Sequence, residues 1–580
     1  MSFKKLLCIC STAFFLLSMS SCTKGIKNLH DGTFIGKGSG RNGIIEVSIN
    51  VVGGKITEAE IIKGNDTPAF MQEAKSQILS QFILEGGTAN LDTISGATIT
   101  SHGILDALDA AIAASQGYKQ KSLIYHDTEC DIVIIGAGGA GLTAATEAAT
   151  KGARVIVLEK MGIVGGNTNF STGGINAAYT KEQRALGIKD SKEVFFNDTM
   201  AGGRYLNNPT LVRKLVDESA DIVEWLQSPL IGADLTDVGA FGGATNKRIH
   251  RPKGGAAIGT HLVPLLSKSA QAQGADIRLN NKVIDILEMN GKAVGVKVKC
   301  EENEYTINSK AVIIATGGFG ANAELLSLYQ PSLAGFATTN HAGATGDILP
   351  MVEKFNAELI QMNLIQTHPT VVKGTGYMIT ESVRGNGAIL VNKNGKRFVN
   401  EMETRDIVSS AILRGPGKTA YLLFDQGIRE SLAVIEDYAS NKWMIEAKSL
   451  KDLAGKLKID ATNLEHTVQK YNHFVTERLD SDFERNPASM DRQIAKAPFY
   501  AIEVEPAIHH TMGGLKINEN AQVIGKDGLP ISGLYAAGEV TGGVHGAERL
   551  GGNAIADICI FGKIAADSAL DFIQKRNLGN

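Results

Sequence analysis

The chain has 580 residues and a formal net charge of −3, and its composition of 43% hydrophobic and 21% charged residues is ordinary for a globular protein of several domains. The absence of a basic excess excludes nucleic acid as an expected partner, and aromatic residues, at 6%, are too few for a base- or sugar-stacking surface. The 65 glycines accompany only 13 prolines and gather in GG and GxG clusters, which suits backbone that packs against phosphates and rings.

The first 22 residues are expected to be a targeting segment. A basic pair at residues 4–5 is followed by residues 6–17, LLCICSTAFFLL, an apolar run too short to span a bilayer. Two serines then precede Cys22, an order that resembles a bacterial lipoprotein signal with Cys22 as the lipidated new N-terminus. Met19 departs from the leucine usual at its position, so export without a lipid is the alternative. Either way the protein is expected outside the cytoplasm, in the periplasm or at the cell surface.

The cysteines beyond this segment give no metal or haem signature. Cys130, Cys300 and Cys559 are flanked by apolar or strand-like sequence, and a free buried thiol is the simplest interpretation of each. Neither CxxC nor CxxCH occurs, so the sequence supports neither a zinc pair nor c-type haem, and we expect no metal site.

A small α+β domain is expected over residues 30–116. The alternation of apolar and polar residues at 45–51 predicts a half-buried strand, and the glycine pair at 53–54 followed by KITEAEII predicts a hairpin. Helices are expected at residues 68–82 and 104–114.

Residues 92–101, DTISGATITS, lie between these two helices and resemble the flavinylation site of FMN-binding domains. In those domains a flavin transferase joins FMN through its phosphate to the threonine of SGAT. The resemblance therefore implies covalent FMN, held by a phosphoester at Thr98. The small residues before Thr98 would admit an enzyme and a phosphate, and a plain helix N-terminus is the alternative.

A polar linker at residues 115–129 leads into a dinucleotide-binding pattern. Residues 130–160 contain a strand, the glycine motif GAGGAG, a helix, a second strand and an acid, Glu159. The glycines let backbone approach a pyrophosphate, the helix N-terminus stabilises its charge, and Glu159 is placed to accept from ribose hydroxyls. In this context the motif predicts a Rossmann-like domain.

Glycine runs further along the chain favour FAD over NAD. They lie at residues 165–174, 315–320, 343–347 and 534–554, and the last one leads into a helix expected at 554–567. The residues expected to contact FAD are Gly136, Ala137, Gly138, Gly141, Glu159, Lys160, Gly166, Asn167, Thr168, Ser171, Gly173, Gly174, Gly317, Gly346, Asp347, Glu539, Gly552, Asn553, Ala554 and Ile555.

The FAD domain is therefore expected to be split into residues 128–360 and 501–580. Residues 361–500 form an inserted α+β capping domain, with helical periodicity at 449–479. The predicted fold class is α/β: a small FMN-binding domain, then a split Rossmann-like FAD domain with its cap. The cleft between cap and FAD domain is the usual place for a small ligand.

The stretch from residue 366 to 406 concentrates groups that bind carboxylates. It carries a histidine, a Thr–Glu pair and arginines that suit planar, bidentate binding of a carboxylate: His368, Thr380, Glu381, Arg384, Arg397 and Arg405. A loop-rich surface with scattered charges is the alternative for this stretch taken alone.

From about residue 130 to its end the chain resembles the soluble fumarate reductases of the flavocytochrome c type, within the wider succinate dehydrogenase/fumarate reductase flavoprotein family. The motifs are THP at 367–369, MxTExxR at 378–384, NExxTRD at 400–406, HHTMGG at 509–514 and HGAxRLGGNA at 545–554. The FMN-type domain takes the place of the haem domain in that family.

The resemblance implies a role for each matching residue. His368 and Thr380 would hold one substrate carboxylate, His509 and Arg549 would hold the other, and Met378 would also contact substrate.

Arg405 would then be the proton donor, supplied by Glu381 and Arg384. Arginine is an unusual acid because its pKa lies far above 7, so a relay must return its proton at once. Asn167 stands where the members with covalent FAD have histidine, which implies non-covalent FAD. His341, His510 and His545 are expected to be structural.

The expected reaction is hydride transfer from reduced FAD to fumarate, with electrons arriving through FMN from an unidentified extracytoplasmic or membrane donor. Another acrylate on the same scaffold, such as urocanate or cinnamate, is one alternative. A surface-tethered flavin electron carrier without catalysis is the other, although the complete cap motifs would then have no purpose.

Overall fold

The computed structural model describes residues 28–578, apart from 41–42, 65–70, 73–74, 89–90, 92, 94–97, 119–124 and 302. The expected targeting segment with Cys22, and most of the SGAT sequence, lie outside these ranges. Within them, no helix is both long and apolar enough to cross a bilayer.

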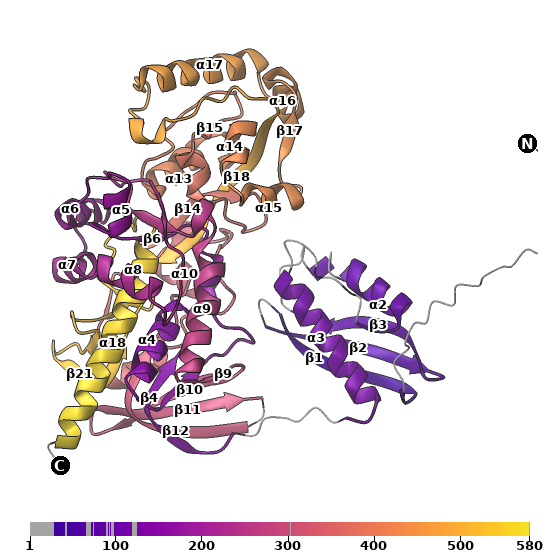
Figure 1. Ribbon diagram of the computed structural model, residues 1–580, viewed down its shortest axis with the longest axis vertical. Coiled ribbons are helices and arrows are strands. Elements are labelled where there is room, and N and C mark those ends of the chain that lie inside the picture. The colour runs from indigo at the N-terminus through magenta and orange to yellow at the C-terminus, as the bar shows by residue number, and fades with distance from the viewer. Residues whose placement is uncertain are drawn as a thin grey trace, which may run out of the picture.

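The N-terminal unit is an antiparallel sheet of β1 (Gly32–Gly40), β2 (Gly43–Val52) and β3 (Lys55–Lys63), with α3 (Thr98–Ser115) across one face (Figure 1). A Cβ at Gly36 or Gly38 would lie 2.0 Å from a backbone oxygen of α3, so glycine is needed for helix and strand to pack this closely. The second helix begins at Thr98, earlier than the expected residue 104, and the described part of the first has a π-helical turn (Lys75–Leu79) followed by α2 (Ser80–Glu85).

A second, mostly parallel sheet forms the centre of the main body and follows the Rossmann-like prediction. Its strands, in sheet order, are β10 (Lys282–Met289), β11 (Lys292–Cys300), β12 (Asn303–Ile314), β4 (Thr128–Ile135), β5 (Val155–Leu158) and β9 (Asp276–Arg278), with β21 (Pro530–Ala536) beside β12 and β20 (Gln522–Ile524) beside β21. β4 pairs in parallel with both β12 and β5, and β12 also pairs in parallel with β21. The strand β21, late in the chain, therefore returns to the sheet that begins with β4.

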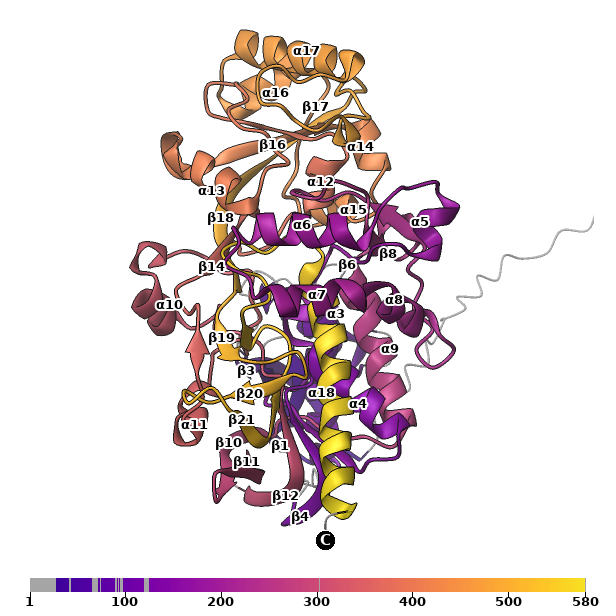
Figure 2. The same ribbon diagram turned by 90° about the vertical axis from the view of Figure 1, so that its left-hand side faces the viewer.

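Helices α4 (Gly139–Thr150) and α18 (Asn553–Leu578) pack against this sheet, and α9 (Ile258–Ala272) packs against α4. Figure 2 shows α18 running beside α4 along the body, and the two helices pack closely. α18 is longer than the helix expected at 554–567, because buried apolar residues such as Ala569 and Ile573 continue its inner face.

The inserted region has a sheet and core of its own. Its strands are β14 (Ile365–Val372), β18 (Phe499–Thr511), β16 (Ala420–Asp425) and β15 (Ile389–Val391), with β17 (Ile445–Ala447) against β18. Its helices are α12 (Glu381–Gly385), α13 (Arg405–Arg414), α14 (Gln426–Glu430), α15 (Ile435–Ser440), α16 (Leu450–Leu457) and α17 (Ala461–Glu477). Because β18 pairs with β14 as far as Thr511, this sheet extends past the domain boundary expected at residue 501.

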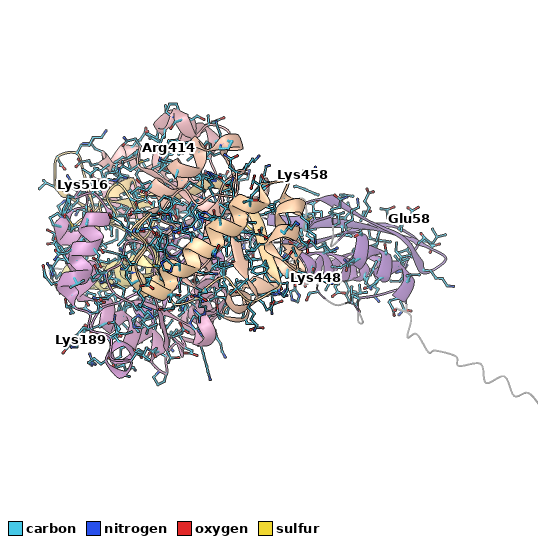
Figure 3. All side chains as sticks on the ribbon, turned by 90° about the horizontal axis from the view of Figure 1, so that it is seen from above. Glu58, Lys189, Arg414, Lys448, Lys458 and Lys516 are labelled. Carbon is cyan, nitrogen blue, oxygen red and sulfur yellow. The ribbon has the colours of Figure 1, made fainter. Side chains whose placement is uncertain are left out.

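The remaining elements form two small three-stranded sheets and several short helices. They are β6 (Ile175–Asn176), α5 (Lys181–Ala185), α6 (Lys192–Gly202), α7 (Pro209–Asp217), α8 (Ser219–Gln227), β7 (Asp237–Gly239), β8 (Ile249–Arg251), α10 (Ala323–Tyr329), α11 (Leu349–Val352), β13 (Leu359–Ile360), β19 (Gly514–Lys516) and β22 (Thr541–Gly542). Seen from above, the N-terminal unit with Glu58 extends to one side of the main body, away from Lys189 and Lys516 (Figure 3). The predicted α/β class, with a small N-terminal unit, a Rossmann-like sheet and an inserted region, agrees with these elements.

Candidate active site

A first cavity lies at the carboxyl end of β4, where α4 begins. Gly136 has φ +103° there, and a Cβ on it would lie 2.4 Å from Ala315 O, so only glycine fits this turn. The predicted FAD residues that line this cavity are Gly136, Gly138, Glu159, Lys160, Gly166, Asn167, Thr168, Gly317, Gly346, Asp347 and Glu539. The N-terminus of α4 points its backbone donors at this space, as a pyrophosphate site requires.

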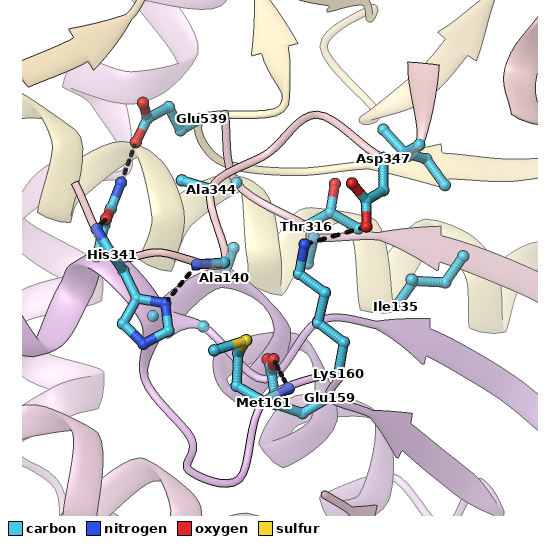
Figure 4. A pocket seen from close by; sticks show the side chains of 18 of the residues that line it. Ile135, Ala140, Glu159, Lys160, Met161, Thr316, His341, Ala344, Asp347 and Glu539 are labelled. Atoms are coloured by element: carbon cyan, nitrogen blue, oxygen red, sulfur yellow. Dashed lines mark hydrogen bonds and ion pairs between the residues drawn. The ribbon is translucent and has the colours of Figure 1, made fainter. Parts of the chain in front are cut away.

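Two charged groups shape the wall of the first cavity (Figure 4). Glu159 accepts from Ala137 N and Met161 N, both at 2.9 Å, and burial raises the pKa of its carboxyl. Burial would also raise the pKa of Asp347, but ion pairs with Lys282 (2.8 Å) and Lys160 (3.2 Å) lower it to about 2. Asp347 is therefore a fixed anion, while Glu159 is oriented by backbone.

A second, larger cavity of about 520 Å³ opens between the FAD-binding region and the inserted region. From the FAD-binding region it is lined by predicted residues Asn167, Thr168, Ser171, Gly173, Gly174, Glu539, Gly552, Ala554 and Ile555. Around the same space it gathers the predicted substrate and catalytic residues His368, Met378, Thr380, Glu381, Arg405, His509 and Arg549. Asn167, Thr168 and Glu539 line both cavities, so one elongated cofactor can extend from the first into the second.

These cavities fit an FAD. Some buried polar atoms along them find no hydrogen-bond partner among the residues that the structure describes: Thr172 Oγ1, Thr316 Oγ1, His368 Nε2, His510 Nε2 and Arg549 Nε. Buried donors and acceptors are normally satisfied, so these atoms mark where a polar ligand is held. The described residues contain no cluster of three His, Cys, Asp or Glu arranged to hold a metal.

Two of the histidines that line the second cavity, His368 and His509, are neutral. His368 Nδ1 accepts from Thr370 N at 3.3 Å, which leaves the ring proton on Nε2. The His509 ring lies 5.1 Å from it, and its Nδ1 lies 2.7 Å from Thr339 Oγ1. Burial, followed by the nearby Arg405, holds the pKa of both rings well below the usual value.

The two arginines of this cavity are joined through one amide. Arg405 donates from Nε to Glu381 Oε2 and from Nη1 to Gln366 Oε1, both at 3.0 Å. Arg549 donates from Nη2 to the same Gln366 oxygen at 3.1 Å and from Nη1 to Leu550 O at 3.1 Å. Burial lowers the pKa of Arg549 to about 9, and the neighbouring Arg405 adds to this effect.

A third arginine lies behind Glu381. Arg384 Nη2 is 3.8 Å from Glu381 Oε2, and its Nη1 donates to Glu401 O at 2.5 Å. Burial lowers the pKa of Arg384 to about 10. Burial alone would raise the pKa of Glu381, but Arg405 and Arg384 lower it, and Gly242 N donates to its Oε1 at 2.8 Å. The three residues thus form a continuous series of ionisable groups that ends at the cavity.

A few predicted cofactor residues lie elsewhere. Ala137 contributes its backbone N–H to Glu159, and Gly141 packs α4 so closely on Gly136 that a Cβ would lie 1.9 Å from its oxygen. The Asn553 side chain accepts from Asn176 at 2.7 Å and donates to Thr199 at 3.2 Å, so it anchors the start of α18. These three residues shape the cavities without lining them.

Sequence reasoning missed several residues that the site uses. Gln366 and Thr339 bond directly to predicted site residues, and Glu548 accepts from Gln366. Gln366 is the first residue of the carboxylate-binding stretch at 366–406, and Glu548 is the variable position of the motif HGAxRLGGNA. Their places within these motifs are the sequence signals that could have identified them. His510 was expected to be structural, but it lines the second cavity with Nδ1 3.5 Å from Glu539.

The N-terminal unit also reaches the second cavity. Thr98 is the first residue of α3, and its side chain lies outside the described part of the structure. Thr100, two residues on, is 1% exposed and lines the cavity together with Phe170 and Tyr377. The predicted attachment point therefore lies at the helix end that meets the FAD-binding cavity.

Comparison with known proteins places these features in a family. Residues 131–555 match the FAD binding domain family and residues 40–113 the FMN-binding domain family. The fumarate reductase (cytochrome) of Shewanella frigidimarina is 46% identical over 470 residues, covering 80% of this chain and 81% of that protein. The urocanate reductase of Eggerthella lenta is 33% identical over 574 residues, covering 95% and 94%. A flavocytochrome c3 fumarate reductase in its open conformation matches with a TM-score of 0.65 and 41% identity, covering 77% of this chain and 79% of that one.

Proposed function

The chain belongs to the FAD-binding flavoprotein family of the flavocytochrome c fumarate reductases, with an added FMN-binding domain, and we propose that it reduces fumarate to succinate. It is an FAD-dependent oxidoreductase. One observation carries the choice of substrate: among the described residues, His368 Nε2 and Arg549 Nε are buried without a hydrogen-bond partner, and both residues line the second cavity together with Thr380 and His509.

In this proposal the two carboxylates of fumarate occupy two clamps. His368 Nε2 and the Thr380 hydroxyl hold one, and His509 with Arg549 Nε holds the other. Neutral histidines suit this task, because they donate without adding charges that would repel the arginines. Two clamps fix the alkene in one orientation and remove its rotational freedom before reaction.

When bound and reduced, FAD supplies a hydride to one alkene carbon. The negative charge that develops on the other side of the double bond is drawn into a carboxylate, where the cationic Arg549 stabilises it. Arg405 donates a proton to the second carbon, so hydride and proton together convert the alkene to the alkane. Glu381 returns a proton to Arg405, and Arg384 supplies Glu381 in turn; their contacts of 3.0 Å and 3.8 Å support this order.

We propose that FAD is bound without a covalent link and FMN with one. Asn167 donates to Asn340 at 2.7 Å and Glu539 at 3.3 Å, and its amide offers no nucleophile for a flavin bond. The position of Thr98 at the start of α3, and of Thr100 in the second cavity, supports FMN attached at Thr98 by a flavin transferase and close to FAD. Electrons would reach FAD by this route from a donor outside the chain.

We also propose an exported, membrane-anchored protein lipidated at Cys22. The support is the order of residues 4–22 alone: a basic pair, an apolar run and small residues before a cysteine.

Aryl acrylates such as urocanate and cinnamate are a second candidate substrate class. Tyr377 lines the second cavity together with Phe170 and Phe241, so aromatic rings form part of its wall. Such a wall could pack against the ring of urocanate or cinnamate, and one relative is a urocanate reductase.

The test is the rate of reduced-dye oxidation by the purified holoenzyme with fumarate, urocanate and cinnamate, with product identified by chromatography. We expect kcat/KM to be highest for fumarate, with succinate as product. A higher kcat/KM for either aryl acrylate would replace fumarate with that class.

A further inference from the structure

The amide of Gln366 connects the two arginines of the second cavity from behind. Its Oε1 accepts from Arg405 Nη1 at 3.0 Å and from Arg549 Nη2 at 3.1 Å. Gln366 is 1% exposed. One carbonyl oxygen therefore sets the placement of the proposed proton donor relative to the proposed carboxylate clamp.

The other end of this amide determines its orientation. Gln366 Nε2 donates to Glu548 Oε1 and to Arg549 O, the latter at 2.8 Å. A reversed amide would point N–H donors at two guanidinium groups and a carbonyl at two acceptors, so all of these hydrogen bonds would be lost. Glu548 is 4% exposed and presents an acceptor whether or not its carboxyl is ionised.

We propose that Glu548 is a positioning residue for the reduction: by fixing the Gln366 amide, it holds Arg405 and Arg549 in the relative placement that proton transfer requires. The inference rests on the proposed function. Arg405 and Arg549 line the second cavity, while Gln366 and Glu548 lie behind them. Glu548 thus acts on the reaction through Gln366, without touching substrate.

Glu548 lies in a buried environment with one hydrogen-bond partner and several cations nearby. Burial raises the pKa of its carboxyl to about 7, and the Gln366 hydrogen bond and the guanidiniums of Arg405, Arg549 and Arg204 oppose that rise. Burying an ionised carboxyl is costly unless it is hydrogen-bonded, and the Gln366 amide supplies that hydrogen bond. A neutral side chain of the same shape would avoid the cost and lose the orientation.

The first experiment compares Glu548→Gln with wild-type holoenzyme, using the acrylate that the wild type reduces fastest. The glutamine keeps the shape, but its amide can present either a donor or an acceptor, so Gln366 loses the partner that accepts in every state. We expect kcat to fall about 10- to 100-fold, the value of a hydrogen bond to a charged group, and the solvent deuterium isotope effect on kcat to increase. The dissociation constant of succinate should change less than about threefold, because Arg549 keeps its bond to Leu550 O.

Glu147→Gln is the matched control. Glu147 is 5% exposed on α4 and pairs with Lys151 at 2.9 Å and Lys563 at 3.0 Å, away from both cavities. Its kcat and isotope effect should stay at wild-type values. A Glu548→Gln enzyme with wild-type kcat, or with a loss of kcat and an unchanged isotope effect, would overturn the proposal.

A double-mutant cycle with Gln366→Ala tests whether the effect passes through Gln366. In the Gln366→Ala background, Glu548→Gln should change kcat less than about twofold. If the double variant instead shows the product of the two single-variant losses in kcat, Glu548 acts independently of Gln366 and the proposal is overturned. If Glu548→Gln does not bind FAD, Glu548→Asp replaces it: the charge stays, the reach is shorter, and the same loss is expected. Because the assay uses the preferred acrylate, failure of the fumarate proposal leaves this test intact.

Discussion

Burial assigns the histidines and arginines of the second cavity to different tasks. His368 and His509 are neutral because burial and neighbouring guanidiniums hold their pKa values well below the usual value, so they add polar groups to the cavity without adding charge. Arg405 and Arg549 supply the cationic groups, and the planar guanidinium of Arg405 lets it contact Glu381 and Gln366 at once. The role of each residue follows from what surrounds it as much as from its type.

Arg405→Lys separates a proton donor from a simple cation. Lysine keeps the positive charge, but its single ammonium group cannot bond to Glu381 and Gln366 while also facing the substrate carbon. If Arg405 donates the proton, turnover should fall on the order of 10⁴-fold, because a catalytic step loses its acid. The measurement is steady-state kcat with FAD and FMN contents verified.

Succinate binding provides the control for Arg405→Lys, since both clamps remain. Retention of more than about a tenth of wild-type turnover would contradict proton donation and leave Arg405 an electrostatic role. Glu381→Gln should give a smaller but substantial loss, because the relay and not the donor is removed.

Glu548 gives a prediction about stability and pH. Its folded pKa of about 7 exceeds the ordinary value of 4.5, so the folded state binds its proton more tightly. The contribution of Glu548 to stability is therefore full below about pH 4.5 and is lost as pH rises through about 7. Relative to Glu548→Gln, wild type should gain up to about 3 kcal/mol of unfolding free energy on going from pH 8 to pH 5. Denaturant unfolding of both proteins at both pH values measures this change. If the difference in unfolding free energy between wild type and Glu548→Gln is the same at pH 8 and pH 5, the pKa of Glu548 is not raised.

At the scale of elements, helix starts place the reactive groups. Glu381 is the first residue of α12, after the N-cap Thr380, and Arg405 is the first residue of α13, after Thr404. The Thr380 hydroxyl accepts from Ser382 N at 3.4 Å, which fixes the first turn of α12. In the N-terminal unit, α3 likewise begins at Thr98 and brings Thr100 to the second cavity.

Thr98→Ala tests the attachment of FMN at the start of α3. Alanine lacks the hydroxyl for a phosphoester, so the variant should carry no covalent FMN and retain FAD, which binds in the main body. Mass spectrometry of protein co-expressed with a flavin transferase measures the adduct on the Thr98 peptide. An FMN adduct that persists in the variant, or that is missing from wild type, would contradict the assignment.

At the scale of the whole molecule, the second cavity exists because three parts of the chain meet there. The FAD-binding region, the inserted region and α3 of the N-terminal unit all contribute to its lining, for example through Ser171, Arg405 and Thr100. Figure 1 shows the N-terminal unit beside the main body and below the inserted region. This arrangement brings a predicted FMN, the FAD and the substrate groups to one place.

Short motifs predicted much of this arrangement from the sequence. The glycine motif with Glu159 predicted the first cavity, and the motifs around His368, Arg405, His509 and Arg549 predicted residues that the fold gathers around the second. Contacts between distant segments could not be predicted in this way.

Gln366 and Glu548 are the clearest example of this limit, because they are 182 positions apart and ordinary in type. Asn553 lies outside the lining for a related reason, since its neighbours in sequence line the cavity while its own side chain anchors α18.

The most direct test of a two-ended carboxylate site compares fumarate with crotonate, which replaces one carboxylate by a methyl group and keeps the alkene. Titration of the FAD absorbance of the oxidised holoenzyme measures both dissociation constants under identical conditions. Losing one charge-assisted clamp costs about 2–3 kcal/mol, so crotonate should bind roughly 30- to 150-fold more weakly than fumarate, and Arg549→Met should remove most of this difference. Crotonate binding within about threefold of fumarate in the wild type would contradict the dicarboxylate site.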